Sequence, residues 1–326
     1  LLTGSANAPG DARIHAGAGR IVRMVLRPLS IAERGIEQPR VSLSALLRGR
    51  AEEISGQTSI ALDDYVHEIV GSGFPAIRTL SGRAQRLQLD GYLARIVERE
   101  LPENGMMTRR PAALLAWLAA YGAASATTAS YTAILNAATA GLIDKPSRSA
   151  VEGYRDHLRR IFVLDPVPAW TPAFTPLKRL SLAPKHHLVD PALAARLLDI
   201  SAGDLLSGST GMRVNGTDTF LGALFESLVT QSVRTYADVA EARVGHLRLH
   251  DGGREIDLIV EGQAGRLVAI EVKLARTVSD SDVRHLNWLK ESLGDRVVDR
   301  VVVTTGEHAY RRRDGVAVVP LALLGP

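Results

Sequence analysis

The chain has 326 residues, enough for two or three domains with a sizeable hydrophobic core. It contains no cysteine, which excludes disulfides and thiolate metal sites and fits a reducing compartment, so we expect a cytoplasmic protein. Lysine and arginine number 39 against 35 aspartate and glutamate residues, and the resulting net charge of +4 permits nucleic-acid binding without requiring it.

The first part of the chain predicts a short strand at 1–3, a Gly/Ala/Pro loop, and mostly helical structure over 41–82, with one helix ending at Gly71. The helix that follows, over 87–100, places Leu89, Leu93, Ile96 and Val97 on one face. The long apolar stretch 111–143 is rich in alanine and broken by glycine and by Ser/Thr pairs. It predicts packed helices, not a membrane span.

The middle of the chain predicts helices from Pro111, over 131–138 and over 147–160, followed by a strand-like segment at 161–170. This order is typical of a winged helix-turn-helix. It makes Arg148, Arg155 and Arg159 on the third helix candidates for DNA contacts. The alternative is that the three arginines form an ordinary solvated helix face.

The last part predicts a helix at 221–236 and strands at 244–250, 254–260 and 266–273. A helix at 280–293 and strands at 300–305 and 316–321 follow. Alternation of helices and strands in this order indicates a mixed α/β domain. Turn signals between the first three strands predict that they form an antiparallel meander.

Two of these apolar strands carry charges near their centres. Side chains alternate along a strand, so we expect the apolar residues of 254–260 and 266–273 to share one face, and Asp257, Glu271 and Lys273 to share the other. One face of the sheet would then be buried, and the opposite face would carry the charges. The alternative is a solvent-facing strand pair with a cross-strand ion pair.

The charged residues suggest a specific chemistry. Asp257 and Glu271 supply the hard oxygen ligands that Mg²⁺ prefers, and Lys273 is placed to orient a water molecule or to stabilise charge on a phosphate. Glu226, at the edge of the apolar face of its helix, is a further carboxylate that we expect in the same cleft. A helical Glu, a strand Asp and an E-x-K strand in this order resemble the PD-(D/E)xK nuclease superfamily. That resemblance implies catalytic roles for all four residues.

Short motifs elsewhere resemble the late portion of a bacterial AAA-type ATPase. They are "LLTGSA", a Gly-Arg pair before "PLS", and a "GFP" that closes a helical lid. The segments "YLARIVERE", "APKHHLVDPALAARLL" and "TFLGALFESLV" resemble the domain of unknown function that follows such a core. The resemblance places Ser5 at the sensor position and Arg20 at that of an arginine finger. Complete members bind ATP through a P-loop, G-x-x-x-x-G-K-[ST], which this sequence lacks.

The resulting expectation is an α/β protein in three parts. Residues 1–83 would be an ATPase remnant with its helical lid, 84–165 a winged-helix-like domain, and 166–326 a mixed-sheet, restriction-endonuclease-like domain. We expect the C-terminal portion of a longer, nucleic-acid-associated AAA-type protein with DNA as partner and Mg²⁺ as the candidate cofactor. Two alternatives stay open: a non-catalytic regulatory or protein-binding module, and a Mg²⁺-dependent DNA endonuclease.

Further basic residues along the middle and end are expected to add non-specific phosphate contacts. They are Arg160, Lys178, Arg179, Lys185, Arg311, Arg312 and Arg313. The neighbouring pair His186 and His187 is expected to be exposed or hydrogen-bonded, because adjacent strand residues point to opposite faces and do not chelate one ion simply.

The missing P-loop gives the first testable prediction. We expect the purified 326-residue chain to show no ATP hydrolysis above a buffer control, because the backbone N–H cradle for the phosphates is missing from its sequence. Turnover that is abolished by a substitution in this chain would contradict the prediction.

Overall fold

The computed structural model describes residues 24–49, 53–103, 110–140, 148–171, 182–208, 213–214, 218–249 and 252–326. Ser5, Arg20, Lys178 and Arg179 lie outside these residues, as does the strand predicted at 1–3. The α-helices are α1 (Ile31–Arg34), α2 (Leu43–Leu47), α3 (Leu62–Val70), α4 (Pro75–Arg78), α5 (Gly82–Arg95), α6 (Leu101–Glu103), α7 (Pro111–Ala123), α8 (Tyr131–Ala138), α9 (Arg148–Arg160), α10 (Pro191–Leu197), α11 (Ala202–Ser207), α12 (Phe220–Val239) and α13 (Asp280–Leu293).

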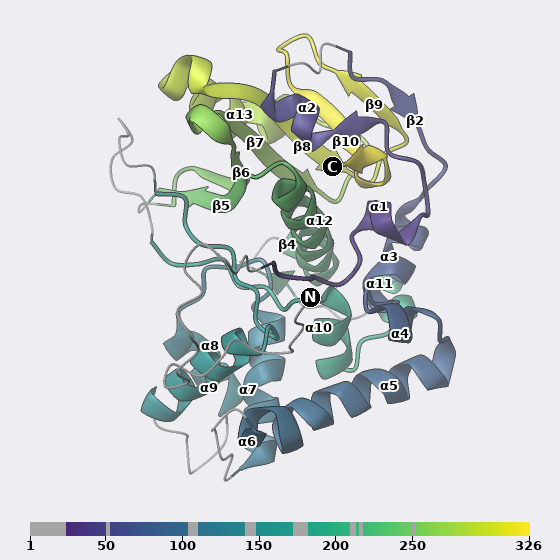
Figure 1. The fold of residues 1–326 in the computed structure, drawn as a ribbon, viewed down its shortest axis with the longest axis vertical. Helices are drawn as coiled ribbons and strands as arrows, with labels where there is room; N and C mark the ends of the chain where they lie inside the picture. The colour runs from purple at the N-terminus through teal and green to yellow at the C-terminus, as the bar shows by residue number, and fades with distance from the viewer. Residues whose placement is uncertain are drawn as a thin grey trace.

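The strands include a mixed sheet at one end of the molecule, with order β2-β9-β10-β8-β7-β6-β5 (Figure 1). The strands are β1 (Val41–Ser42), β2 (Gly56–Gln57), β3 (Arg213–Val214), β4 (Asp218–Thr219), β5 (Arg243–Arg248), β6 (Glu255–Glu261), β7 (Leu267–Lys273), β8 (Val297–Thr304), β9 (His308–Arg311), β10 (Ala317–Pro320) and β11 (Leu324–Gly325). The β5-β6-β7 meander is antiparallel, and β7 runs parallel to β8 through the α13 crossover. The prediction of a mixed α/β fold is confirmed, although β9 was not predicted.

Helices cover both faces of this sheet. α12 packs against β5 and β7, and α13 packs against β6, β7 and β8. Leu258 and Val260 belong to the apolar core that includes α12, whereas Ile256 and Ile259 belong to a second core with α13. The expectation of one apolar and one charged face is therefore wrong.

A β-bulge explains why the simple alternation fails. Gly245 pairs with Ile259 and Leu247 with Ile256, so two steps along β5 face three steps along β6. The extra residue interrupts the two-residue period on β6. Ile256 and Leu258, which were expected on one face, consequently lie in different cores.

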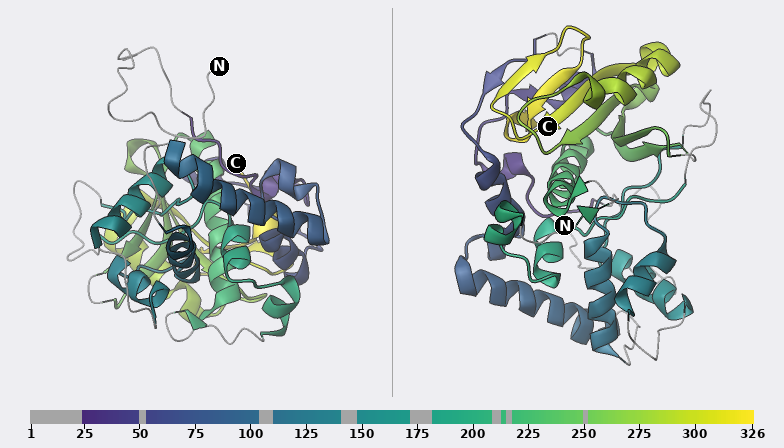
Figure 2. Two further views of the ribbon diagram at one scale, coloured as in Figure 1. Left: turned by 90° about the horizontal axis from the view of Figure 1, so that it is seen from below. Right: turned by 180° about the vertical axis from the view of Figure 1, so that it is seen from behind.

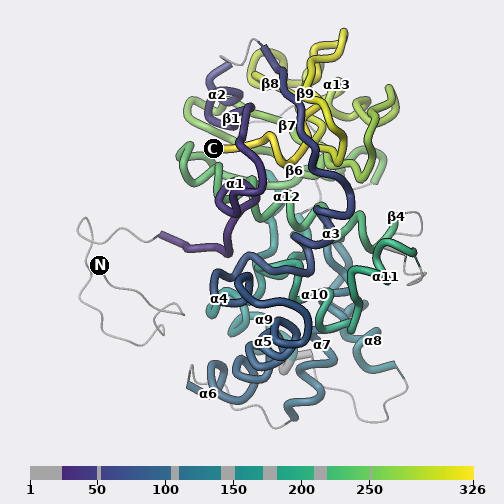
Figure 3. The backbone as a smooth tube through the Cα atoms, turned by 90° about the vertical axis from the view of Figure 1, so that its right-hand side faces the viewer, coloured from purple at the N-terminus to yellow at the C-terminus, as the bar shows by residue number. Residues whose placement is uncertain are grey.

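The strands β1 and β2 join the sheet region, although the sequence assigned these residues to the first part of the chain. β1 pairs with β11 at the C-terminal end, and β2 pairs with β9 at the edge of the sheet. Figure 3 shows β1 beside the C-terminus. The described part of residues 1–83 thus packs onto the end of the chain.

The middle of the chain holds α7, α8 and α9 and a small set of paired extended segments. The backbone of His186 exchanges hydrogen bonds with Ala126 and Thr127, both 2.8 Å long. The neighbouring Lys185 exchanges two bonds of 2.9 Å with Val167. Three helices and three extended segments therefore form one unit. Its hydrogen-bonded pairs include residues beyond 165, where the sequence predicted that the second domain would end.

The helices predicted along the chain agree closely with those in the structure. α8 and α13 have the predicted bounds, α3 ends before Gly71, and the predicted apolar face of 87–100 is buried. That last helix continues from α5 into a π-helical turn, Ile96–Glu100. Within the described residues, no helix has the length and apolar character that a membrane crossing requires.

α12 lies between the sheet and the helices at the other end of the molecule, as the view from behind in Figure 2 shows. Its 20 residues are buried over most of their surface, including polar side chains such as Gln231 and Ser232. A helix buried all round needs partners for each polar side chain that it carries.

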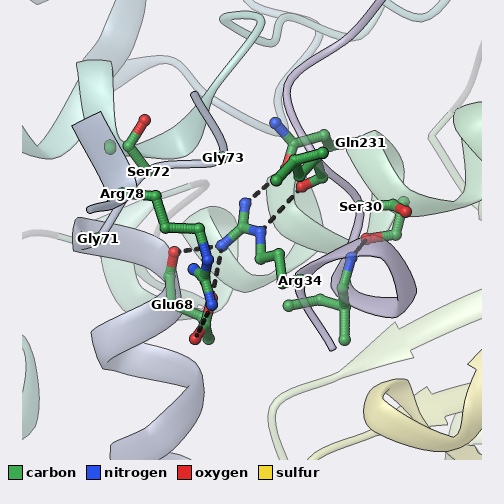
Figure 4. Close-up of polar contacts among 12 residues, drawn as sticks. Ser30, Arg34, Glu68, Gly71, Ser72, Gly73, Arg78 and Gln231 are labelled. Carbon is green, nitrogen blue, oxygen red and sulfur yellow. Dashed lines mark hydrogen bonds and ion pairs between the residues drawn. The ribbon is translucent and has the colours of Figure 1, made fainter. Parts of the chain in front are cut away.

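One such partner is Arg34, whose side chain is fully buried. Its guanidinium donates to the Glu68 carboxylate at 2.9 Å, to the backbone oxygens of Leu29 and Glu68, and to Gln231 on α12 at 3.0 Å (Figure 4). Arg78 also pairs with Glu68. The "PLS" and "GFP" segments border this cluster, so they contribute here to a structural contact between α1, α3 and α12.

Arg34→Met should lower the free energy of unfolding by roughly 3–5 kcal/mol, because it leaves buried acceptors without their donor. Urea unfolding checks this value. The control is Arg86→Met on the exposed side of α5, which should change stability by less than about 0.5 kcal/mol. Equal effects of the two variants would contradict the role of the buried cluster.

Candidate functional site

The four predicted catalytic residues line one cavity of about 510 Å³. Glu226 comes from α12, Asp257 from β6, and Glu271 and Lys273 from β7. The strands β6 and β7 are paired, so their charged residues meet at one end of the sheet, beside the first turns of α12. The remaining lining residues are Ala126, Lys185, Thr219, Gly222, Ala223, Glu255, Val272, Leu274, Ala275 and His285.

Asp257 lies where β6 separates from β7. Pairing of the two strands begins at Leu258 and Ile270, and the Asp257 side chain accepts a hydrogen bond from the Val272 backbone at 2.9 Å. This bond satisfies a donor of β7 that has no strand partner in the meander, and it fixes the second oxygen of the carboxylate. The bulge on β6 lies next to Asp257 and turns it toward α12.

Lys185 is the residue that the sequence did not place in the site. Its Nζ lies 2.9 Å from Glu226 Oε1, 2.9 Å from Asp257 Oδ1 and 3.2 Å from Glu255 Oε1. The side chain is 1% exposed. The expectation that Lys185 contributes to a surface for phosphate is therefore wrong, because its ammonium is directed inward among three carboxylates.

The charge of Lys185 follows from these contacts. Burial alone would lower its pKa, but the carboxylates of Asp257, Glu226 and Glu255 raise the pKa well above the ordinary value. Lys185 is therefore an ammonium ion at neutral pH; it donates hydrogen bonds to Glu226 and Asp257 and forms an ion pair with Glu255.

Glu271 and Lys273 form a second, more exposed pair in the same cavity. Lys273 Nζ lies 3.0 Å from Glu271 Oε1, and the lysine side chain is 34% exposed. Glu271 Oε2 is buried and has no hydrogen-bond partner among the described residues. Burial, with the nearby Asp257 charge, raises the pKa of Glu271 well above its usual range.

Glu226 is also held in an unusual protonation state. Burial and the neighbouring Asp257 charge raise its pKa to about 8, although Lys185 acts in the opposite direction. The carboxyl group is thus mostly protonated at pH 7. Asp257, in contrast, has a lowered pKa, because Lys185 and Lys273 outweigh its burial.

These contacts do not suit the expected Mg²⁺ ion. The ammonium of Lys185 occupies the position between Asp257 and Glu226, and Asp257 Oδ2 is already bonded to Val272. The described residues contain no group of three or more His, Asp or Glu side chains arranged to hold a metal ion. Asp257 and Glu271 therefore do not form a ready Mg²⁺ site while Lys185 is in place.

The histidine pair next to Lys185 is buried, and both rings are hydrogen-bonded. His186 contacts the backbone oxygen of Ala129 at 2.7 Å, and His187 contacts Ser227 Oγ on α12 at 2.9 Å. These bonds place the two rings on opposite sides of the extended segment. They hold the backbone that carries Lys185.

The arginines predicted to contact DNA lie on α9. Arg155 pairs with Asp156 at 3.1 Å and stacks over the Tyr131 ring, whereas Arg159 is exposed. Arg148 begins the helix. Glu152 is exposed on the same helix, so its surface carries both signs of charge.

Two further basic residues that were predicted to contact phosphate have ion-pair partners within the fold, as Lys185 does. Arg311 pairs with Asp299, and Arg312 pairs with Asp280 and Asp314, at the end of the sheet. Arg313 is exposed. The basic surface expected from the sequence is consequently smaller than the residue count indicates.

Comparisons with known families match two parts of the chain. Residues 221–324 match the model of a domain of unknown function (DUF4143), which is typically found after AAA-type ATPase domains. Residues 62–204 match a second domain of unknown function (DUF8612). The sequence predicted a single domain of unknown function over the three segments that resemble one, and the comparisons divide these segments between two such domains. Neither a curated protein nor a solved structure matches the chain.

The cavity contains residues from both matched regions. Glu226, Asp257, Glu271 and Lys273 belong to the first, and Lys185 belongs to the second. The ion pairs of Lys185 therefore join the two regions inside the site.

The raised pKa of Glu226 predicts a pH-dependent stability. The folded protein binds a proton that the unfolded chain releases near pH 4.3, so stability falls as pH rises from there toward 8. Glu226→Gln removes this titration, and its stability should fall less between pH 6 and 8, by roughly 1–3 kcal/mol. Urea unfolding at both pH values measures the difference, and parallel pH profiles would contradict the assignment.

Proposed function

We propose that this chain is the C-terminal portion of an AAA-type ATP-binding protein and serves as its nucleic-acid-binding module. In this proposal the cavity keeps the residues of a nuclease-like site without hydrolysing DNA, and the phosphate contacts are made by arginines of α9 such as the exposed Arg159. The observation that carries the proposal is the meeting of Glu226, Asp257, Glu271 and Lys273 in one cavity that also contains the Lys185 ammonium.

The arrangement of elements supports a nuclease-like origin. A long helix supplies Glu226, and two paired strands supply Asp257 and an E-x-K sequence, which is the order of the PD-(D/E)xK superfamily. The match to a domain that typically follows AAA-type ATPase domains supports the placement after an ATPase core.

The middle of the chain supports nucleic-acid binding. One extended segment near residue 126 lies between α7 and α8, and two more, near 167 and 186, follow α9; their hydrogen bonds join them into one small set of pairings. This is the order of a winged helix, in which the third helix reaches DNA. Because α9 offers arginine and histidine but no Asn or Gln to read adenine, we expect phosphate contacts to dominate over base contacts.

The second candidate is a Mg²⁺-dependent DNA endonuclease. The uncommitted Oε2 of Glu271 and the partly exposed ammonium of Lys273 favour it, since a metal ligand and a phosphate-directed cation are both present. It requires that Lys185 leave the carboxylates.

We expect binding of short DNA duplexes to weaken as salt rises, with a slope of about −0.9 per phosphate contacted. Arg159→Gln should weaken binding to all sequences alike and reduce this slope by about 1, whereas Arg86→Gln on α5 should leave it unchanged. Fluorescence anisotropy at several salt concentrations measures both. Complete absence of binding would favour a protein-binding platform, and a strong preference for one short sequence would show that base readout matters.

DNA incubated with the wild-type protein and Mg²⁺ or Mn²⁺ should stay intact, because the ammonium of Lys185 occupies Oδ1 of Asp257, one of the two expected metal ligands. Cleavage that is lost in Asp257→Asn and retained in Asp63→Asn, at an exposed position of α3, would instead establish the endonuclease.

A further inference from the structure

Lys185 contacts the carboxylates as a bound cation would, but its ammonium belongs to a side chain that is buried in the fold. A single ammonium satisfies carboxylate oxygens from two separate elements, Glu226 on α12 and the pair Glu255 and Asp257 on β6. All three distances lie within 3.2 Å. A hydrated metal ion in the same place would need these oxygens as ligands, so the two cations exclude each other.

The backbone holds the ammonium in place. Lys185 exchanges two hydrogen bonds of 2.9 Å with Val167, and His186 exchanges two of 2.8 Å with Ala126 and Thr127. The side chain of His187 is anchored to α12 through Ser227. The lysine is therefore fixed by neighbours on both sides, and it does not reach the cavity from a surface position.

Lys273 differs from Lys185 in each of these respects. Its side chain is 34% exposed and pairs with Glu271 alone at 3.0 Å. It lines the cavity without separating Asp257 from Glu226. The chain thus offers two lysines in one cavity, one enclosed by carboxylates and one at its open side.

We propose that Lys185 is a resident counter-ion that takes the place of a divalent metal ion in this cavity. Without its ammonium, the carboxyl groups of Glu226, Glu255 and Asp257 face one another with Glu271 nearby, and a divalent cation that displaces their protons gains several oxygen ligands. The comparison with nucleases rests on the proposed function, but the exclusion of a metal ion by Lys185 does not depend on DNA binding.

The test is an isothermal calorimetric titration of the full chain with Mn²⁺ alone. Lys185→Met should bind Mn²⁺ at least about tenfold more tightly than the wild type. Lys273→Met, the matched control, should show no such gain. Adding Asp257→Asn to Lys185→Met should remove the gain, because it deletes a ligand that the ammonium had covered.

Tight Mn²⁺ binding by the wild type, equal to that of Lys185→Met, would overturn the proposal, as would a folded Lys185→Met that gains no affinity. Should Lys185→Met unfold without metal, recovery of its structure on adding Mn²⁺ supports the proposal. If the structure does not recover, the double variant Lys185→Met with Glu226→Gln, which removes one buried carboxyl group together with the ammonium, is titrated with Mn²⁺, and its gain or lack of gain in affinity decides in the same way.

A measurement on the wild-type protein tests independently whether the Lys185 ammonium excludes a metal ion. The Nζ signal of Lys185 in nitrogen-resolved NMR should show slow proton exchange and stay unchanged in millimolar Mg²⁺, whereas loss or displacement of the signal would overturn the proposal. DNA binding measured on the same samples separates the two ideas. If DNA is not bound but the Mn²⁺ results hold, only the proposed function fails.

Discussion

The burial of α12 is the constraint on which the rest of the structure depends. A helix enclosed on nearly all sides cannot leave its polar side chains to water, so most of them need partners within the protein, although the buried Thr230 hydroxyl has none among the described residues. Glu226 meets Lys185, Ser227 meets His187, Gln231 meets Arg34, and Ser232 accepts from the backbone of Ile31. These partners come from the start and the middle of the described chain.

The polar contacts of α12 therefore connect regions that the sequence presents as separate parts. The helical segment after residue 24 is connected to α12 through Arg34, and the unit that contains α7, α8 and α9 is connected to it through Lys185 and His187. The sheet is tied to it through apolar packing and through the ion pair of Lys185 with Asp257. A change in the position of any one region would reach the cavity through α12.

Periodic elements could be predicted from the sequence, and irregular ones could not. The bounds of α8 and α13 and the meeting of Glu226, Asp257, Glu271 and Lys273 follow from local patterns of helix and strand. The bulge beside Asp257 has no signal in the alternation of apolar residues, and it places Ile256 and Leu258 in different cores.

Lys185 was missed for a different reason. It lies 41 residues from Glu226 and 72 from Asp257, so no spacing rule links it to them. The only signal is its setting in "LAPKHHLVD", where a single lysine precedes two histidines and the apolar pair Leu188 and Val189. A lysine in such a segment predicts either a surface position or a buried ion pair, and the choice requires knowing which elements pack against it.

The central claim is that an internal ammonium, not a metal ion, balances the carboxylates of the cavity. The most direct measurement is anomalous diffraction from crystals of the wild-type protein grown with Mn²⁺. The account predicts no anomalous peak between Asp257 and Glu226, with the Lys185 side chain still in contact with both. A strong peak at that position, with Lys185 displaced, would contradict it.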